Sequence, residues 1–238
     1  MPTVLRASDI TVRYGGVVAV NKVSLTLNSG QILGLIGPNG AGKTTFFNAI
    51  TGFAPVTQGT ITYLQKDVTH MPAYERTRMG MGRTFQTERP FAELTVLENV
   101  LISAFLHTSD RKSADSIALQ AIEKVGLLDR THQPAADLNL ARLRRLELAK
   151  ALAVQPKIIF LDEIMAGLNP PALKEMIGLV KGLTADGMSV LMVEHIMEAI
   201  IELADHVIVL ASGNQIAAGS ARDVITDDRV IEAYLGTD

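Results

Sequence analysis

The chain has 238 residues and a formal net charge of -3 at pH 7, and 47% of its residues are hydrophobic. A chain of this length can build one sizeable core with a small second lobe, but it is too short for two domains of ordinary size. The lack of a basic excess argues against a nucleic-acid-binding protein, because binding a phosphate backbone requires many lysine and arginine side chains. The sequence has no cysteine, which excludes disulfides, thiol catalysis and cysteine metal sites.

The sequence shows no segment expected to enter a membrane. No uninterrupted apolar run approaches the roughly 20 residues that cross a bilayer, and residues 1–6 lack an apolar signal core. We therefore expect any membrane association to be peripheral or to depend on a partner. No internal repeat or low-complexity segment is detectable, so we expect one compact unit without a linker.

The N-terminal segment is expected to form antiparallel strands. Residues 5–14 alternate polar and apolar side chains, which is typical of a half-buried strand, and residues 14–16 (Tyr-Gly-Gly) predict a turn. Residues 17–27 read as another pair of strands, which predicts two or three strands in all. Tyr14 ends the first strand, where its ring could stack on an adenine base. A packing role at the sheet edge is the more common use of a tyrosine in this position.

A phosphate-binding loop follows the next short apolar run. The segment from Gly37 to Thr44 matches the complete pattern G-x-x-x-x-G-K-[ST]. Its glycines allow a tight turn with N–H groups aimed inward, and the helix that follows adds the positive end of its dipole. Lys43 is then expected to reach the β- and γ-phosphates, and the Thr44 hydroxyl to bind Mg²⁺. The expected nucleotide-binding residues of this loop are Gly37, Pro38, Asn39, Gly40, Ala41, Gly42, Lys43, Thr44 and Thr45.

The middle of the chain predicts a helical insertion into an alternating α/β pattern. Three segments with helical spacing of apolar residues follow one another, at 95–106, 113–125 and 143–154. A helix, a strand, a second helix and a short strand that ends at Gln86 are expected before them. The expected bounds of these four elements are 44–51, 60–64, 73–79 and 80–86. The basic run within 142–145 reads first as a solvated helix face.

Two later apolar strands end in polar side chains that suit phosphate chemistry. The first ends in Asp162 and Glu163, and the second ends in His195. Ligands of open α/β sheets bind at the carboxyl ends of parallel strands. We therefore expect Asp162 to hold the Mg²⁺ shell and Glu163 to polarise the attacking water, although adjacent acids after a strand also cap helices. The elements expected in this part of the chain are strands at 157–163 and 189–195, a helix from Pro170, a hairpin over 207–219 and a helix over 229–235.

Taken in order, these motifs resemble those of an ATP-binding subunit of an ABC transporter. The resemblance covers essentially the whole chain and a series of ordered motifs, which makes it far more specific than one phosphate loop. The segments that carry it are Tyr14, 37–45, Gln86, 138–149, 162–163, 166–170 and His195. A narrower set looks most like the ATPase subunits of branched-chain amino acid uptake systems, although importers of urea, amides or aromatic acids use similar subunits. This set comprises 83–86, 94–100, 166–170, 193–195 and 230–236.

The resemblance implies the fold and its division. The expected fold class is α/β, a P-loop NTPase with a RecA-like core, an antiparallel β-subdomain and an inserted α-helical subdomain. Residues 1–238 would form a single nucleotide-binding domain. The ATP-binding core with its β-subdomain would comprise 1–85 and 156–238, and the helical subdomain would comprise 86–155.

The resemblance also implies the cofactors, ATP and Mg²⁺, and the roles of individual residues. Glu163 would act as general base, His195 would bridge the γ-phosphate and the attacking water, and Gln86 would contact Mg²⁺ and the same water. Thr44, Gln86 and Asp162 would hold Mg²⁺. Gln86 would also lie where the helical lobe meets the permease, which couples ATP occupancy to permease shape.

Two such chains would sandwich two ATP molecules head to tail, each adenine stacked on Tyr14. A heterodimer with a paralogue is favoured over a homodimer. The segment that would complete the partner's site departs from the family, because residues 138–142 read Leu-Asn-Leu-Ala-Arg where Leu-Ser-Gly-Gly-Gln is usual. A functioning variant and a weakened half-site both remain open. The residues expected to act in trans are Asn139, Leu140, Ala141 and Arg142.

The sequence therefore predicts an ATPase that powers an ABC importer, for branched-chain amino acids or a related small solute. Its partners would be a second ATP-binding subunit, integral-membrane permeases and, indirectly, a periplasmic or extracellular solute-binding protein, with no nucleic acid. It would act peripherally at the cytoplasmic face of the inner or plasma membrane. The alternatives are a non-transport soluble ABC ATPase acting on ribosomes or nucleic acid, and a different P-loop enzyme such as a GTPase or small-molecule kinase. The first alternative usually carries tandem ATPase units or long coiled-coil insertions, and the sequence shows neither.

Overall fold

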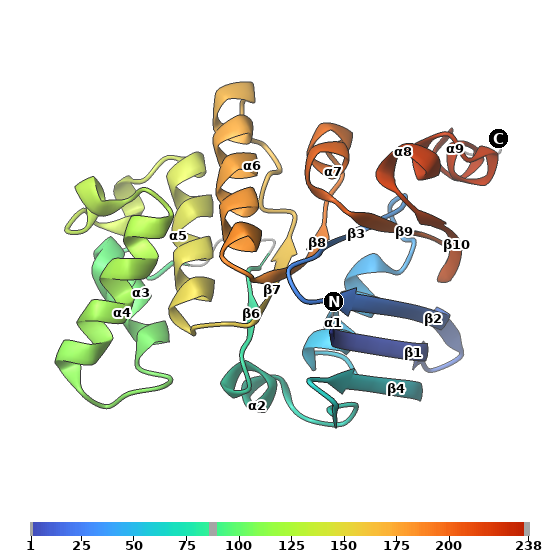
Figure 1. The fold of residues 1–238 in the computed structure, drawn as a ribbon, viewed down its shortest axis with the longest axis horizontal. Coiled ribbons are helices and arrows are strands. Elements are labelled where there is room, and N and C mark those ends of the chain that lie inside the picture. Colours follow the sequence, from blue (N-terminus) through green and yellow to red (C-terminus); the bar gives the residue numbers. More distant parts are fainter. Residues whose placement is uncertain (1, 86–89, 236–238) are drawn as a thin grey trace.

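The structure is a computed structural model that describes residues 2–85 and 90–235. These residues form two sheets with helices between and around them, and a separate group of helices at one side (Figure 1). The chain enters the second sheet with its third strand, goes back to the first sheet for two strands, and then returns to the second sheet, whose strands come both before and after the helical group. The predicted α/β fold class is confirmed.

The smaller sheet is antiparallel, with strand order β2-β1-β4-β5. Its strands are β1 (Thr3–Tyr14), β2 (Val17–Asn28), β4 (Gln58–Tyr63) and β5 (Lys66–Asp67). The prediction of a strand pair over 17–27 is wrong, since one continuous strand spans it. The pairing of β1 with β2 shifts register at several points, and Lys22 has a φ of 50°. Such irregularities bend a strand without ending it, so a broken polar pattern can resemble two strands.

The larger sheet is parallel except for β10, with strand order β10-β9-β3-β8-β7-β6. Its strands are β3 (Ile32–Ile36), β6 (Met81–Arg83), β7 (Ile158–Asp162), β8 (Ser189–Val193), β9 (His206–Ala211) and β10 (Asn214–Gly219). Every residue of β3, β7 and β8 is buried. Because β3, β8 and β7 are neighbours and run the same way, the polar groups that follow them meet at one edge of the sheet.

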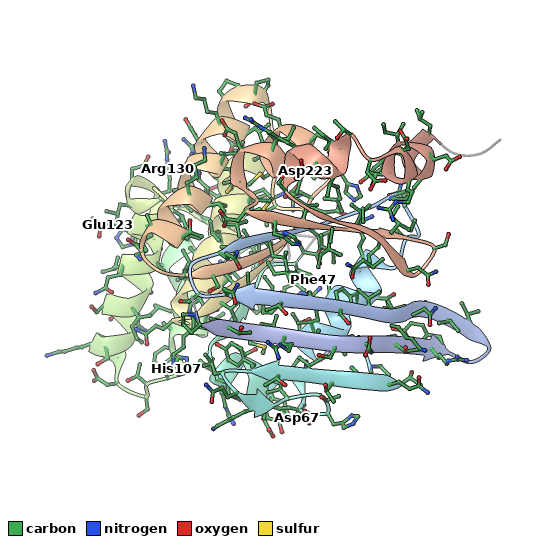
Figure 2. All side chains as sticks on the ribbon, turned by 45° about the vertical axis from the view of Figure 1, so that its right-hand side comes forward. Phe47, Asp67, His107, Glu123, Arg130 and Asp223 are labelled. Carbon is green, nitrogen blue, oxygen red and sulfur yellow. The ribbon has the colours of Figure 1, made fainter. Side chains whose placement is uncertain are left out.

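Helix α1 (Lys43–Thr51) lies between the two sheets, where Phe46, Phe47 and Ile50 are completely buried. Phe47 packs edge-on against Phe160 of β7 with ring centroids 5.6 Å apart, and Figure 2 shows it between the sheets. The helix therefore joins both sheets through one apolar core. The other helices outside the helical group are α2 (Ala73–Arg78), α6 (Pro170–Ala185), α7 (Met197–Leu203), α8 (Ala221–Ile225) and α9 (Asp228–Leu235).

Helices α3 (Val96–Ala104), α4 (Arg111–Lys124) and α5 (Leu140–Ala153) pack on one another and form a lobe at the left of Figure 1. Helix α5 starts three residues before its predicted start. The reason is a cap, since the Asn139 side chain accepts a hydrogen bond from the Arg142 N–H at 3.0 Å. Residues 138–142 therefore form the start of a helix. Within the described residues, the helices are all too short or too polar to cross a membrane.

Candidate functional site

The phosphate-binding loop joins β3 to α1 in a backbone conformation that requires glycine. Gly37 has a φ of 147°, and an added Cβ would lie 2.1 Å from the carbonyl oxygen of Leu210 in β9. No L-residue fits there without moving β9. The Lys43 ammonium bonds back to this loop, donating to the carbonyls of Gly37 at 2.7 Å and Pro38 at 2.8 Å. Burial lowers the pKa of Lys43, and the nearby Glu163 carboxylate opposes that shift.

A cleft of about 520 Å³ opens over this loop and brings several predicted site residues together. Residues 39–45 line it, with Glu163 and His195 on the side of β7 and β8. The first strands and the β9–β10 turn form the remaining wall. Those lining residues, which the sequence reasoning missed, are Val17, Val18, Ala19, Ser212 and Gly213. These residues line the cleft because the β1–β2 and β9–β10 hairpins lie beside the phosphate loop in the fold, and no local sequence pattern reveals that position.

Four predicted nucleotide- or metal-binding residues lie beside the cleft but not in its lining. Gly37 is the buried first residue of the loop, and Asp162 directly precedes Glu163 and has 3% of its surface exposed. Tyr14 is half exposed at the end of β1 and pairs with Val17, which does line the cleft. Pro38 also falls outside the lining. Gln86 lies outside the described residues, so its predicted catalytic and Mg²⁺-binding roles stay predictions.

Glu163 and His195 form a hydrogen-bonded pair at the cleft, with Nε2 2.8 Å from the Glu163 carboxylate Oε1. Glu163 has a φ of 51°, in the left-handed region that a residue with a Cβ rarely adopts. Its N–H donates to the Val193 carbonyl at 2.9 Å, which ties this turn to the end of β8. The sheet thus holds the Glu163 carboxylate beside the imidazole and next to the phosphate loop. This is the geometry of a general base held by an orienting group.

Asp162 is held by Arg83, a residue to which the sequence reasoning assigned no role. The guanidinium donates to Asp162 Oδ2 at 3.0 Å and to the Thr51 hydroxyl at 2.7 Å. It also lies 4.8 to 5.1 Å from the ring centroids of Phe47, Phe53 and Phe85. Burial raises the pKa of Asp162, and Arg83 opposes the shift. One arginine therefore links the acid at the end of β7 to the end of α1.

A second buried acid stands behind the cleft. Glu194 is 1% exposed, and its Oε1 accepts a hydrogen bond from the Met165 N–H at 3.1 Å. Burial raises the pKa of Glu194 to about 7. The carboxyl group thereby fixes the turn after Glu163 to the end of β8. The only sequence signal was an acid directly after an apolar strand, and that signal does not distinguish a buried acid from an exposed one.

Residues 138–142 stand apart from this cleft, and none of its described lining residues comes from that segment. Asn139 caps α5, and its side chain takes up the Arg142 N–H, one of the donors that the first turn of a helix leaves without a backbone partner. Leu140 is 39% exposed. A helix N-terminus attracts anions, but within the described chain this one faces no nucleotide cleft.

The comparisons with known proteins agree with this geometry. A family model described as "ABC transporter" matches residues 20–166. The chain is 39% identical to the high-affinity branched-chain amino acid transport ATP-binding protein LivG of Salmonella typhimurium, over 98% of the chain and 97% of the relative. It is 34% identical to BraF of Pseudomonas aeruginosa, described in the same words, over 98% of both chains.

Solved structures show the same similarity over the complete fold. One is a nucleotide-free ATP-binding cassette from an ABC transporter, with a TM-score of 0.91 and 30% identity, covering 99% of this chain and 100% of that one. Another is an ATP-binding cassette of an ABC transporter in its ADP conformation, with a TM-score of 0.91 and 31% identity, covering 100% of both chains. The predicted fold, a P-loop NTPase cassette, is confirmed by these structures.

Proposed function

Because the chain belongs to the ABC transporter family, we propose that it binds and hydrolyses ATP to power an importer of branched-chain amino acids or a related small solute. The observation that carries the catalytic part is the Glu163–His195 pair, 2.8 Å apart, facing the phosphate loop across one cleft. The transported solute rests on the two similar proteins whose names include branched-chain amino acid transport.

Each residue of the cleft has its own role in the proposed transfer of the γ-phosphoryl group to water. The loop N–H groups and Lys43 hold the triphosphate, and Lys43 exchanges its carbonyl partners for phosphate oxygens. Glu163 accepts the proton of the attacking water while His195 keeps the carboxylate in place. The Thr44 hydroxyl and the Asp162 carboxylate are hard oxygen donors that suit Mg²⁺, and they stand at the loop and at the end of β7. Bound Mg²⁺ would neutralise charge on the β- and γ-phosphates.

A second ATP-binding chain would complete each cleft. The cleft is open to solvent, and among the described residues none of 138–142 lines it. A head-to-tail pair would bring the two together, with Asn139, Leu140, Ala141 and Arg142 acting on the partner's γ-phosphate. We favour a heterodimer with a paralogue, because branched-chain uptake systems pair two such subunits.

The surface beside Arg83 is suited to dock a permease. Phe53 and Phe85 are each about half exposed there, and their rings pack edge-on, 5.7 Å between centroids. Exposed aromatic groups of this kind commonly mark protein interfaces. Gln86 follows Phe85 directly in the sequence, so a permease segment on this surface would adjoin the residue expected to couple ATP occupancy to permease shape. Attachment through it would place the chain at the cytoplasmic face, and a solute-binding protein would act only through the permease.

The test compares wild-type protein with Glu163→Gln. We expect the substitution to reduce phosphate release by roughly 100-fold or more, because it removes the general base, while nucleotide binding is retained. Light scattering with Mg-ATP should then show an ATP-dependent dimer, because the trapped nucleotide holds the sandwich closed. Normal turnover in this variant would remove Glu163 from the mechanism. A variant that binds ATP but stays monomeric would mean either that residues 138–142 have lost their γ-phosphate contacts or that a paralogous partner and the permease are required.

Co-purification separates the transport function from its alternative. We expect the tagged chain to retain a polytopic membrane protein during purification from solubilised membranes, with Phe53→Ser/Phe85→Ser weakening that association. Sedimentation with ribosomes and no membrane partner would instead support the soluble ABC ATPase.

A further inference from the structure

The C-terminal helix touches the phosphate loop through one side chain. The hydroxyl oxygen of Tyr234 in α9 accepts a hydrogen bond from the Gly37 N–H at 2.8 Å. The carbonyl of the same glycine accepts the bond from Lys43 at 2.7 Å. Gly37 is thus held on one side by α9 and on the other by the loop lysine. Residues 197 positions apart meet at the first turn of the loop.

This bond satisfies a buried donor at a point where β3 has ended. Gly37 is buried and follows Ile36, the last residue of the strand, so its N–H lies beyond the β3–β9 ladder. A buried N–H that loses its acceptor is costly, and the loop would move to recover one. Burial raises the pKa of Tyr234, so the phenol stays neutral at physiological pH and its oxygen remains an acceptor beside its own O–H.

Helix α9 has few other anchors. Val230 is buried, but Ile231 is 41% exposed and Leu235 is 80% exposed. An apolar cavity of about 430 Å³ separates α9 from α7, and Ile36 and His195 also line it. A helix with so little buried apolar surface opens locally at low free-energy cost. The Tyr234 bond therefore contributes a large share of what holds α9 against the loop.

We propose that Tyr234 is a positioning residue for nucleotide binding and that α9 is a strap whose docking on the phosphate loop is coupled to ATP. The inference rests on the proposed nucleotide site. Docked α9 fixes the Gly37 peptide, and the fixed peptide keeps the loop in the conformation that receives phosphate. Coupling of this kind is reciprocal, so bound nucleotide must strengthen the docking of α9 by the same factor.

The first test is Tyr234→Phe in the full chain, with Tyr74→Phe as the matched control. Tyr74 also bonds through its hydroxyl, to Glu75, but it lies on exposed α2 away from the cleft. We expect Tyr234→Phe to weaken Mg-ATP binding about 3- to 10-fold, the range expected for one hydrogen bond. The turnover number at saturating ATP should change less than about twofold, since the Glu163–His195 pair is untouched. Tyr74→Phe should change neither quantity.

The second test measures the coupling directly by amide hydrogen exchange over α9. Mg-ADP should slow exchange in α9 of the wild-type protein by about the factor by which Tyr234→Phe weakens nucleotide binding. It should not slow exchange in the variant. This readout separates a positioning role from a purely structural one, because a structural role would change exchange equally with and without nucleotide.

The outcomes distinguish this inference from the proposed site. The proposed coupling of α9 to nucleotide would be wrong if Tyr234→Phe left nucleotide affinity unchanged and Mg-ADP did not slow amide exchange in α9 of the wild-type protein. Failure of the wild-type chain to bind Mg-ATP, or equal binding by Lys43→Ala, would instead overturn the nucleotide site itself. A variant with normal thermal stability but weakened binding supports the inference, because the lost hydroxyl then acts on the loop and not on the fold.

Discussion

The nucleotide cleft and the start of α5 are two halves of one proposed site, and they are built differently. Around the cleft, Asp162, Glu163 and Glu194 stand at the ends of buried strands, and each is held by a partner from another element. At the start of α5, Asn139 bonds within its own helical turn, and Leu140 is exposed. The first half is fixed by the chain's own interior, whereas the second is a capped helix end whose proposed ligand belongs to another chain.

The two halves are nevertheless connected within the chain. Leu140 packs on the segment after Glu163, since a Cβ added to Gly167 would lie 3.1 Å from its Cδ2. Arg144 of α5 donates to the Ala166 carbonyl at 3.4 Å in the same segment. These two contacts join the start of α5 to the segment that directly follows Glu163, the proposed general base. In the proposed function, the cleft would therefore supply the chemistry, and the start of α5 would make that chemistry depend on a partner.

The largest expected effect concerns the interior of the cleft half. The Glu194 pKa of about 7 lies above its unfolded value of 4.5, so the folded state holds this proton more tightly. Its contribution to stability is complete below pH 4.5 and is lost as the pH rises to about 7, which amounts to a decline on the order of 3 kcal/mol. Glu194→Gln should remove this decline from the free energy of unfolding, measured by denaturant titration between pH 4.5 and 7.5. Exposed Glu123→Gln is the control, and a Glu194→Gln curve parallel to the wild type would contradict the buried acid.

The next effect tests the α5 half. Asn139→Ala removes the helix cap and the amide proposed to reach the partner's phosphate, so ATP-dependent dimerisation in the Glu163→Gln background should weaken about tenfold, while nucleotide affinity of the monomer is unchanged. Light scattering over a protein dilution series measures this. Asp110→Ala is the matched control, because Asp110 caps α4 through the same kind of bond at 2.8 Å. Equal dimerisation in both variants would mean that residues 138–142 are only a helix start.

A smaller effect is expected where the cleft meets the proposed permease surface. In Arg83→Lys the planar fork to Asp162 and Thr51 is lost while the charge is kept, so Asp162 becomes less well fixed. The Mg²⁺ concentration needed for half-maximal nucleotide binding should rise about fivefold, as followed with a fluorescent nucleotide. Arg76→Lys is the control, since Arg76 is buried at the same end of α1 but bonds backbone carbonyls. If both variants lose stability and neither needs more Mg²⁺, the role of Arg83 would be limited to packing.

The sequence was sufficient for groups whose chemistry is encoded locally. The phosphate loop is a contiguous pattern, and Glu163 and His195 each follow an apolar run that could only be a buried strand. The sequence did not predict the roles of residues that depend on a partner far away in the chain, because the sequence next to them carries no pattern that indicates the contact. Arg83 meets a residue 79 positions away, Glu194 one 29 positions away and Tyr234 one 197 positions away.

Element boundaries were missed for related reasons. Helices α7 and α8 have seven and five residues, too few to establish a 3.6-residue period. The start of α5 was placed too late because Asn139 was considered only as a phosphate contact, although asparagine is among the preferred helix caps. The Asn139 side chain thus has a role in the fold as a helix cap, which the local sequence indicates, and a proposed role in the site as a phosphate contact.

An effect as small as that of Arg83→Lys is expected for Tyr14, which belongs to neither half. Its ring is half exposed at the β1–β2 turn and adjoins the cleft through Val17, so an adenine stacked on it would remain partly in water. Tyr14→Ala should therefore weaken ATP binding only about fivefold, the low end for stacking of a base on an aromatic ring. Tyr14→Phe, which keeps the ring, should bind normally, and calorimetry with ATP and GTP measures both. Unchanged ATP affinity in Tyr14→Ala would mean that Tyr14 only packs at the edge of the sheet. Much tighter binding of GTP than of ATP would contradict the stacking of adenine on Tyr14.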